Sequence, residues 1–277
     1  THARFAISTI AEDGAISLDE PETLHTADHV SFQTAWEDYR ARKGGHLPDA
    51  VSLAIAGRTS GDAIRFTNNP WVIRPALIKE KLGATRYTLV NDFAAVAHAV
   101  AQAPDDQFLH LAGPDQPLAA EGTLSVLGPG TGLGVAHLWR DSSGYRVQAT
   151  EGGHVDFAPL DQIEDAILAR LRKRHMRVSV ERVVSGPGIV EIYATLAALE
   201  GKPVAEMDDV SIWQAGMEGS DSLAAAAVDR FCLALGSVAG DFALAQGGFG
   251  GVVIACARSS PDRALPSGFA PRGALRT

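Results

Sequence analysis

Cysteine is scarce in this 277-residue chain, which contains only Cys232 and Cys256. Neither residue belongs to a CxxC pair, and no cluster of cysteine and histidine has the spacing of a zinc site. We therefore expect no metal-binding residues. Such sparse use of cysteine is typical of a cytoplasmic protein.

Positive charge is also in short supply, because 24 Lys and Arg residues face 33 Asp and Glu residues and leave a net charge of -9. Nucleic acid and anionic membranes are bound through basic patches, so neither is expected as a partner. No uninterrupted apolar run of about 18 residues predicts a membrane span. No signal peptide is predicted, and the chain starts within a predicted strand at Thr1, as a trimmed chain or a fragment would.

Strand and helix patterns alternate along the first hundred residues. Residues 29–45 have helical apolar spacing and end in a Gly-Gly stop, and the apolar run at 49–57 predicts a strand buried on both faces. A further strand is predicted at 86–92, followed directly by a helix at 93–104. This alternation indicates an α/β fold with a largely parallel sheet.

A second set of elements follows a connection at residues 102–122, and its longest helical pattern covers residues 222–246. The expected strands cover residues 123–128, 133–140, 145–150 and 250–257. Strands followed by helices thus occur twice, which indicates two related lobes. The last twenty residues, 258–277, contain three prolines and four arginines without any period, and we interpret them as a flexible tail.

Asn91 and Asp92 lie between a predicted strand and a predicted helix. Ligands of open α/β sheets bind at the carboxyl ends of strands, where a carboxylate can accept a proton from a substrate hydroxyl. The adjacent carboxamide of Asn91 can donate and accept hydrogen bonds at once. The alternative interpretation is structural, with Asp92 serving only as the N-cap of the helix.

Polar side chains also crowd around two glycines in the stretch TEGGHVDFAP, which contains Glu151, His154 and Asp156. Such side chains can turn into one small pocket and supply the paired donors and acceptors that sugar hydroxyls need. A surface loop with a hydrogen-bonded histidine is the alternative. A metal site is a third interpretation, but the stretch has no HxxxH pattern and no cysteine nearby to support it. Glu181, further along, is either a first-turn helix residue that favours the helix dipole or another hydroxyl acceptor.

Four glycines interrupt the apolar stretch LSVLGPGTGLGVAHLW at residues 124–139. This turn lacks the GxxxxGK[ST] pattern, and it is followed by a strand rather than by the helix of a dinucleotide-binding turn. Gly130, Thr131, Gly132 and Gly134 suit a hairpin that presents N–H groups and a hydroxyl to phosphate. A plain tight hairpin remains the alternative.

Five stretches agree in order and spacing with one family. They are NDFAAVA, GPGTGLGVAHL, EGGHVDFAP, ERVVSGPGIV and GGFGGVVIA, and the likeness extends from about Thr1 to Ala255. On these stretches the chain resembles bacterial ATP-dependent glucokinases that lack the zinc-binding cysteine motif, within the actin-like sugar kinase superfamily. The resemblance implies a two-lobed α/β fold of the actin-like, RNase H-like type with an interlobe cleft. The small lobe would cover residues 1–101 and would lack the first strand of the family pattern. The large lobe would cover residues 102–257, and the tail would cover residues 258–277.

The resemblance also implies roles for individual residues. Asp92 would be the general base that takes the proton from the glucose 6-hydroxyl. The other glucose hydroxyls would be held by Asn91, Glu151, His154 and Glu181. The ATP phosphates would face Thr1, Gly130, Thr131 and Gly132. ATP and Mg²⁺ are the implied cofactors, glucose is the implied substrate, and a homodimer is allowed.

Two departures from the family pattern define the hypotheses. The family begins with a strand and an Asp-x-Gly-Gly-Thr turn, of which only Thr1 is present, and the segment after Ala255 diverges. The first hypothesis is a glucokinase, which transfers the γ-phosphoryl group of ATP to the 6-hydroxyl of glucose. The second is a non-catalytic glucose sensor or a decayed kinase. The third is that the sequence comes from an incomplete or frame-shifted gene model and folds poorly.

Overall fold

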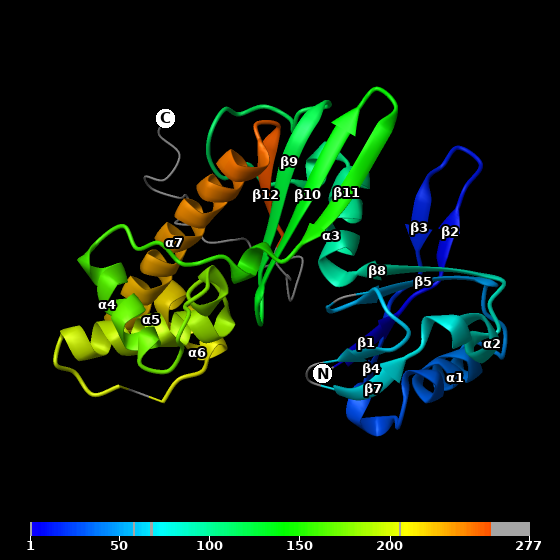
Figure 1. The fold of residues 1–277 in the computed structure, drawn as a ribbon, viewed down its shortest axis with the longest axis horizontal. Helices are drawn as coiled ribbons and strands as arrows, with labels where there is room; N and C mark the ends of the chain where they lie inside the picture. Colours follow the sequence, from blue (N-terminus) through cyan, green and yellow to red (C-terminus); the bar gives the residue numbers. More distant parts are fainter. Residues whose placement is uncertain (1, 58, 67–68, 205, 256–277) are drawn as a thin grey trace. The chain divides into compact units, whose positions relative to one another are not determined.

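The computed structural model describes residues 2–57, 59–66, 69–204 and 206–255 (Figure 1). The chain divides into two compact units, Thr1–Ala95 and Val96–Thr277. This division falls inside helix α3 (Asp92–Gln102), whereas the sequence places the lobe boundary at the end of that helix. The lobe assignment therefore stays a prediction. Thr1 and the predicted tail lie outside the described residues.

The first unit contains several short strand pairs. Its strands are β1 (His2–Phe5), β2 (Ser8–Ile10), β3 (Ile16–Leu18), β4 (Glu22–His25), β5 (Ala50–Ile55), β6 (Ile64–Phe66), β7 (Asn69–Ile73) and β8 (Arg86–Asn91). The pairs β1–β4, β2–β3 and β6–β7 are antiparallel, and β5–β8 is parallel. The strands predicted at 49–57 and 86–92 are confirmed as β5 and β8. The predicted burial of the first on both faces is wrong, because buried and exposed residues alternate along β5.

Helix α1 (Phe32–Arg42) anchors the core of this unit. Ser31 starts the helix because it forms a capping box with Thr34, and Gly44 adopts a positive φ just after the end, as the predicted Gly-Gly stop requires. Trp36 and Tyr39 are buried, and the Tyr39 ring stacks on Phe5 with centroids 5.0 Å apart. These contacts join α1 to β1 in one apolar core.

The second unit is built on one four-stranded sheet in the order β11-β10-β9-β12 (Figure 1). Its strands are β9 (Gly122–Pro129), β10 (Leu133–Asp141), β11 (Gly144–Thr150) and β12 (Gly251–Ile254), which confirms the strands predicted here. The expected largely parallel sheet is wrong, because only β12–β9 and β5–β8 pair in parallel among the described strands. Short turns join β9 to β10 and β10 to β11, and such turns can connect only antiparallel neighbours.

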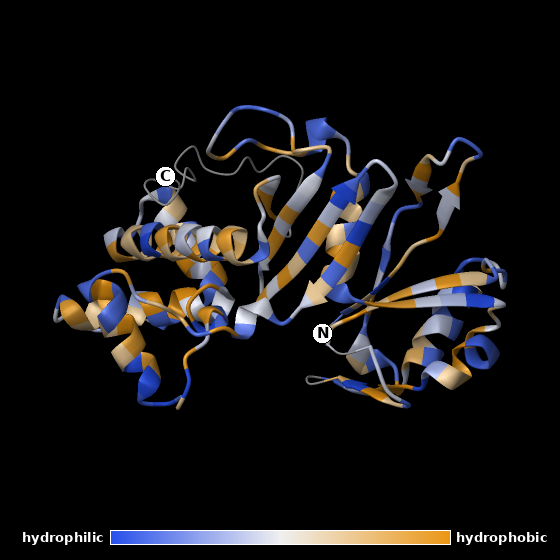
Figure 2. Ribbon diagram, turned by 45° about the horizontal axis from the view of Figure 1, so that its top comes forward, coloured by the Kyte–Doolittle hydropathy of each residue, from blue (hydrophilic) through white to orange (hydrophobic). Residues whose placement is uncertain are grey.

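Helices complete the core of the second unit. They are α4 (Gln162–Arg172), α5 (Gly186–Leu199), α6 (Asp209–Glu218) and α7 (Ser222–Gln246), the last at the predicted bounds. Helix α7 packs on β9 and β12 and also contacts α5 and α6. Figure 2 shows apolar and polar residues alternating along much of this sheet, whereas in the interior strand β9 every residue from Leu124 to Gly128 is buried.

Helix α7 is long and apolar enough to cross a membrane, with a mean hydropathy of 1.5 over its most apolar window, and no other helix in the described ranges is. Half of that window is buried inside the unit. Phe231, Leu235 and Phe242 contribute to the apolar core. The core helix of a globular unit has the same length and composition, so these two properties alone do not indicate a membrane span.

An ion-pair group links α4 to α5 and gives a pH-dependent prediction. Burial by itself raises the pKa of the Glu191 carboxyl, but hydrogen bonds and charge from Arg174 and Arg170 outweigh it, so the pKa is lowered overall. A carboxyl whose pKa is depressed by folding stabilises the protein above its ordinary pKa of 4.5 and loses that contribution as the pH falls through the lower, folded pKa. Glu191→Gln should therefore unfold about 1 kcal/mol more easily at pH 7.

The difference between native protein and Glu191→Gln should shrink as the pH is lowered below about 4.5. Urea denaturation of both proteins at pH 7 and at several lower pH values measures it. The matched control is Glu200→Gln, because Glu200 pairs with Lys202 on the exposed surface and should contribute little. A Glu191→Gln difference that stays constant with pH would contradict the assignment.

Candidate functional site

Asn91 and Asp92 stand at the junction of β8 and α3 in the first unit. The Asn91 Oδ1 atom accepts hydrogen bonds from the N–H groups of Phe93 and Ala94, at 2.9 and 3.0 Å, and its Nδ2 atom donates to the Gly57 carbonyl at 3.2 Å. Asn91 therefore caps α3, and the alternative interpretation of Asp92 as the N-cap is wrong by one residue. Within the described residues, the exposed Asp92 carboxylate accepts a hydrogen bond only from Phe93 N.

Three predicted sugar-site residues come together in the second unit. Glu151 precedes the short 3-10 helix η4 (Gly152–His154), and Glu181 lies in η5 (Val180–Arg182). The His154 imidazole stands between the two carboxylates, with Nδ1 3.9 Å from Glu151 Oε2 and Nε2 3.6 Å from Glu181 Oε1. Two stretches that are about thirty positions apart in the sequence thus form one cluster.

Backbone packing holds this cluster in place. A Cβ atom at Gly153 would lie 2.2 Å from the Leu133 carbonyl oxygen, and one at Gly152 would lie 2.8 Å from Val135 Cβ, so only glycine lets η4 approach β10 this closely. The chain after His154 pairs with the chain before Glu181, because the N–H of Val180 donates to the Val155 carbonyl at 2.9 Å.

Asp156, another candidate, does not join the cluster. Its carboxylate pairs with Arg177, and its backbone forms an isolated bridge with Ser179. Asp156 therefore helps to align the two chain segments that carry His154 and Glu181.

Glu181 is not the first-turn residue of a long helix. Helix α5 begins at Gly186, where the Ser185 hydroxyl oxygen accepts a hydrogen bond from Gly188 N at 3.2 Å. The Glu181 carboxylate instead accepts a hydrogen bond from the backbone N–H of Leu133 at 3.0 Å, through Oε2. The helix-dipole alternative for Glu181 is therefore wrong, and its side chain is directed toward the glycine turn.

The glycine turn itself covers residues 130–132, between β9 and β10. The Gly130 N–H donates to the Gly132 carbonyl at 2.8 Å, and the Gly130 carbonyl accepts from Gly186 N at 2.7 Å. Among the residues that the structure describes, the N–H groups of Thr131 and Gly132 have no acceptor. These two N–H groups and the Thr131 hydroxyl are thus the donors that the turn can offer to an anion.

The predicted site residues belong to two groups, one in each unit. Asn91 and Asp92 belong to the first unit, and the turn and the Glu151–His154–Glu181 cluster belong to the second. Thr1 lies outside the described residues. Sequence reasoning missed the contacts of Leu133 and Gly186 with these motifs, because a backbone N–H leaves no signal in the residue type.

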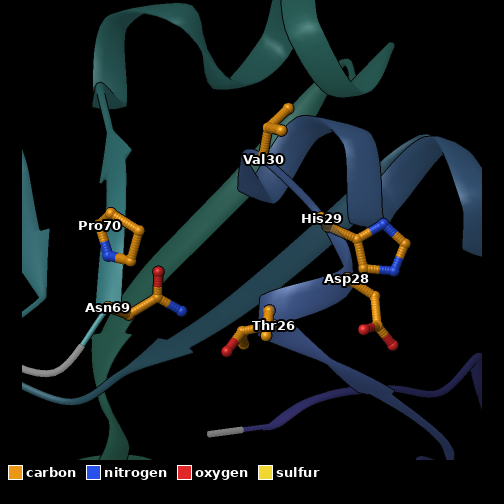
Figure 3. Close-up of a pocket in the computed structure, with 7 residues that line it drawn as sticks. Thr26, Asp28, His29, Val30, Asn69 and Pro70 are labelled. Atoms are coloured by element: carbon orange, nitrogen blue, oxygen red, sulfur yellow. The ribbon is translucent and has the colours of Figure 1, made fainter.

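One pocket, of about 440 Å³, lies in the first unit and contains none of the predicted site residues (Figure 3). Its lining residues are Thr26, Ala27, Asp28, His29, Val30, Asn69 and Pro70. The Trp71 side chain donates from Nε1 to the His29 carbonyl at 2.9 Å, and its backbone N–H donates to Asn69 Oδ1 at 2.8 Å. The first bond ties the two lining segments together, and the second is a local bond within one of them.

The chemistry of the second-unit cluster favours a polyhydroxy ligand. Two carboxylates and one imidazole supply several hydrogen-bond acceptors and one exchangeable donor. No group of three or more His, Cys, Asp or Glu side chains in the described ranges is placed to hold a metal ion. The cluster therefore offers hydroxyl recognition beside an anion-binding turn.

Comparison with known proteins gives a consistent family. A family model described as Glucokinase matches residues 1–257. The chain is 50% identical to a glucokinase of Zymomonas mobilis over 278 residues, covering 99% of this chain and 86% of that protein. It is 40% identical to a glucokinase of Caulobacter sp. over 257 residues, covering 92% of this chain and 76% of the other.

Solved structures agree with this. A glucokinase from an Antarctic psychrotroph superposes with a TM-score of 0.77 at 33% identity, covering 93% of this chain and 80% of that one. A glucokinase from Balamuthia mandrillaris in complex with glucose gives a TM-score of 0.71 at 20% identity, covering 91% and 76% of the two chains, which supports the fold alone. The predicted actin-like sugar kinase fold is confirmed by these neighbours.

Proposed function

The chain belongs to the glucokinase family, and we propose a role for each of its predicted site residues in the glucokinase reaction. As a member of the family it is an ATP-dependent hexose kinase that transfers the γ-phosphoryl group of ATP to the 6-hydroxyl of glucose. We assign Asp92 as the general base. We assign the other glucose hydroxyls to Asn91, Glu151, His154 and Glu181, and the ATP phosphates to Gly130, Thr131 and Gly132, with Thr1 included on the family pattern.

One observation carries the assignment in the second unit. His154 stands between the carboxylates of Glu151 and Glu181, and Glu181 also contacts the start of β10 beside the glycine turn. A hydroxyl-binding cluster next to an anion-binding turn is the arrangement that a sugar kinase needs. Within the turn, Thr131 and Gly132 supply the N–H donors, while Gly130 shapes the turn because its own N–H is used internally.

Asp92 suits proton abstraction because the neighbouring residue, Asn91, is the N-cap of helix α3. Asn91 caps α3, so the Asp92 carboxylate keeps acceptor capacity for a substrate hydroxyl. Phosphoryl transfer needs little covalent help from the protein and depends on positioning and charge neutralisation. A carboxylate that accepts the hydroxyl proton as the new O–P bond forms is the general base that this reaction requires.

Mg²⁺ is proposed to enter the site together with ATP. Protein sites commonly bind Mg²⁺ through one or two carboxylates plus substrate phosphates, and it keeps several waters. When bound, the ion neutralises charge on the phosphates, while the turn residues orient them.

Calorimetric titration of glucose tests the sugar assignment. Removing the imidazole in His154→Ala should weaken glucose binding by about tenfold or more, because buried hydroxyls would lose partners on binding. Glu151→Gln should weaken it less, since the amide still accepts one hydrogen bond. Glu200→Gln, at an exposed pair with Lys202, is the control and should bind like the native chain.

Unchanged glucose affinity in His154→Ala would remove the cluster from the sugar site.

We also propose that the protein forms a homodimer and that it is located in the cytoplasm. Light scattering on the purified chain tests the first, and fractionation of producing cells tests the second.

A further inference from the structure

The Glu181 carboxylate uses its two oxygens in two directions. Oε1 lies 3.6 Å from His154 Nε2, on the side of the hydroxyl-binding cluster. Oε2 accepts the backbone N–H of Leu133 at 3.0 Å, at the residue where the glycine turn ends and β10 begins. One partly buried carboxylate, 29% exposed, therefore touches both functional elements of the second unit.

The turn is packed directly against this carboxylate. A Cβ atom at Gly132 would lie 2.3 Å from Glu181 Oε2, so the glycine is in contact with the carboxylate along its open face. At the other end of the turn, Gly186 N donates to the Gly130 carbonyl at 2.7 Å. The six residues from Glu181 to Gly186 thus hold the turn at both ends.

We propose that Glu181 is a positioning residue for the nucleotide, and that it couples glucose binding to ATP binding through the Leu133 N–H and the glycine turn. This inference rests on the assignments proposed above. A glucose hydroxyl that donates to Oε1 fixes the orientation of the carboxylate, and Oε2 then holds Leu133 and the turn in one geometry. ATP binding to a turn that is already ordered costs less conformational entropy.

Two conservative variants separate the effect of side-chain length at position 181 from the effect of its negative charge. Glu181→Gln keeps an oxygen at the same distance from Leu133 N but loses the charge, whereas Glu181→Asp keeps the charge but is one methylene too short. Binding of AMPPNP with Mg²⁺ in the absence of glucose is measured by calorimetry. We expect Glu181→Asp to bind the nucleotide about fivefold or more weakly, and Glu181→Gln to stay within about twofold of the native chain.

Glu151→Asp is the matched control, because the Glu151 carboxylate lies near His154 and, within the part of the chain that the structure describes, has no hydrogen bond or ion pair to the turn. It should change glucose binding and leave AMPPNP binding unaltered. In the native chain, saturating glucose should tighten AMPPNP binding by about fivefold, and nucleotide should tighten glucose binding by the same factor, as linkage requires. This mutual tightening should be lost in Glu181→Asp.

The outcomes separate the two levels of inference. If Glu181→Asp binds AMPPNP like the native chain, or if Glu151→Asp weakens it equally, the coupling role is overturned. The role is also overturned if Glu181→Gln, rather than Glu181→Asp, loses nucleotide affinity, because charge and not reach would then decide. If neither position affects glucose affinity, the sugar assignment fails, while the glucose-free AMPPNP data still decide whether Glu181 positions the turn.

Discussion

Asp92→Asn should lower kcat by about 10²–10⁴-fold, with the KM for glucose changing by less than about threefold. The substitution keeps the size of the side chain, and its amide oxygen can still accept the Phe93 N–H. The helix start is unaffected because Asn91, not Asp92, caps α3. What is lost is the proton acceptor for the 6-hydroxyl, which acts only as the transition state forms, so kcat and not substrate affinity should fall.

A coupled assay of ADP release at varied glucose and saturating ATP measures both constants. Asp105→Asn is the matched control, because Asp105 is exposed in the short helix η3 (Asp105–Gln107) and has no assigned role. Its kcat should equal that of the native chain. A native-like kcat for Asp92→Asn would remove Asp92 as the base, and an increase in KM alone would make it a binding residue.

Gly153→Ala should destabilise the second unit by about 1–3 kcal/mol and lower its melting temperature by on the order of 5 °C. The new Cβ would lie 2.2 Å from the Leu133 carbonyl oxygen, and that atom belongs to the backbone of β10. Backbone in a paired strand cannot move aside as a side chain can, so η4 must shift instead. His154 would move with it, and the KM for glucose should rise as well.

Thermal unfolding followed by circular dichroism, together with the kinetic assay, measures both effects. Gly130→Ala serves as the stability control, because a Cβ there meets nothing within 4 Å and its backbone φ is not positive. It adds the same methyl group at an open position and should melt close to the native chain. Equal melting of Gly153→Ala and the native chain would mean that the close approach of η4 to β10 is relaxed in solution.

Local patterns in the sequence were sufficient for much of the fold. The strands on both sides of the glycine turn and the bounds of α7 follow from apolar periodicity and from glycine stops, which depend only on neighbouring residues. The parallel sheet was predicted wrongly because strand direction depends on connections. In the second unit short turns connect β9, β10 and β11, so these strands are antiparallel. The prediction of a parallel sheet rested on the alternation of strands and helices in the first hundred residues, which does not continue there.

The candidate site was predictable in its residues but not in its contacts. The residue types and the glycines mark the motifs, so Glu151, His154 and Glu181 could be named from the sequence. That Glu181 binds the N–H of Leu133, 48 positions earlier, could not be named, because every residue except proline carries the same backbone donor. The cap at Asn91 was missed for a related reason, since Asn and Asp are almost equally good caps.

The closeness of Gly132 to Glu181 also limits how such a protein can diverge. Any larger residue at position 132 would occupy the space of the Glu181 carboxylate, so that side chain would have to swing away from the turn. A side chain added at position 132 would thus disturb the sugar-site carboxylate as well as the turn, whereas a shorter residue at position 181 leaves Gly132 in place.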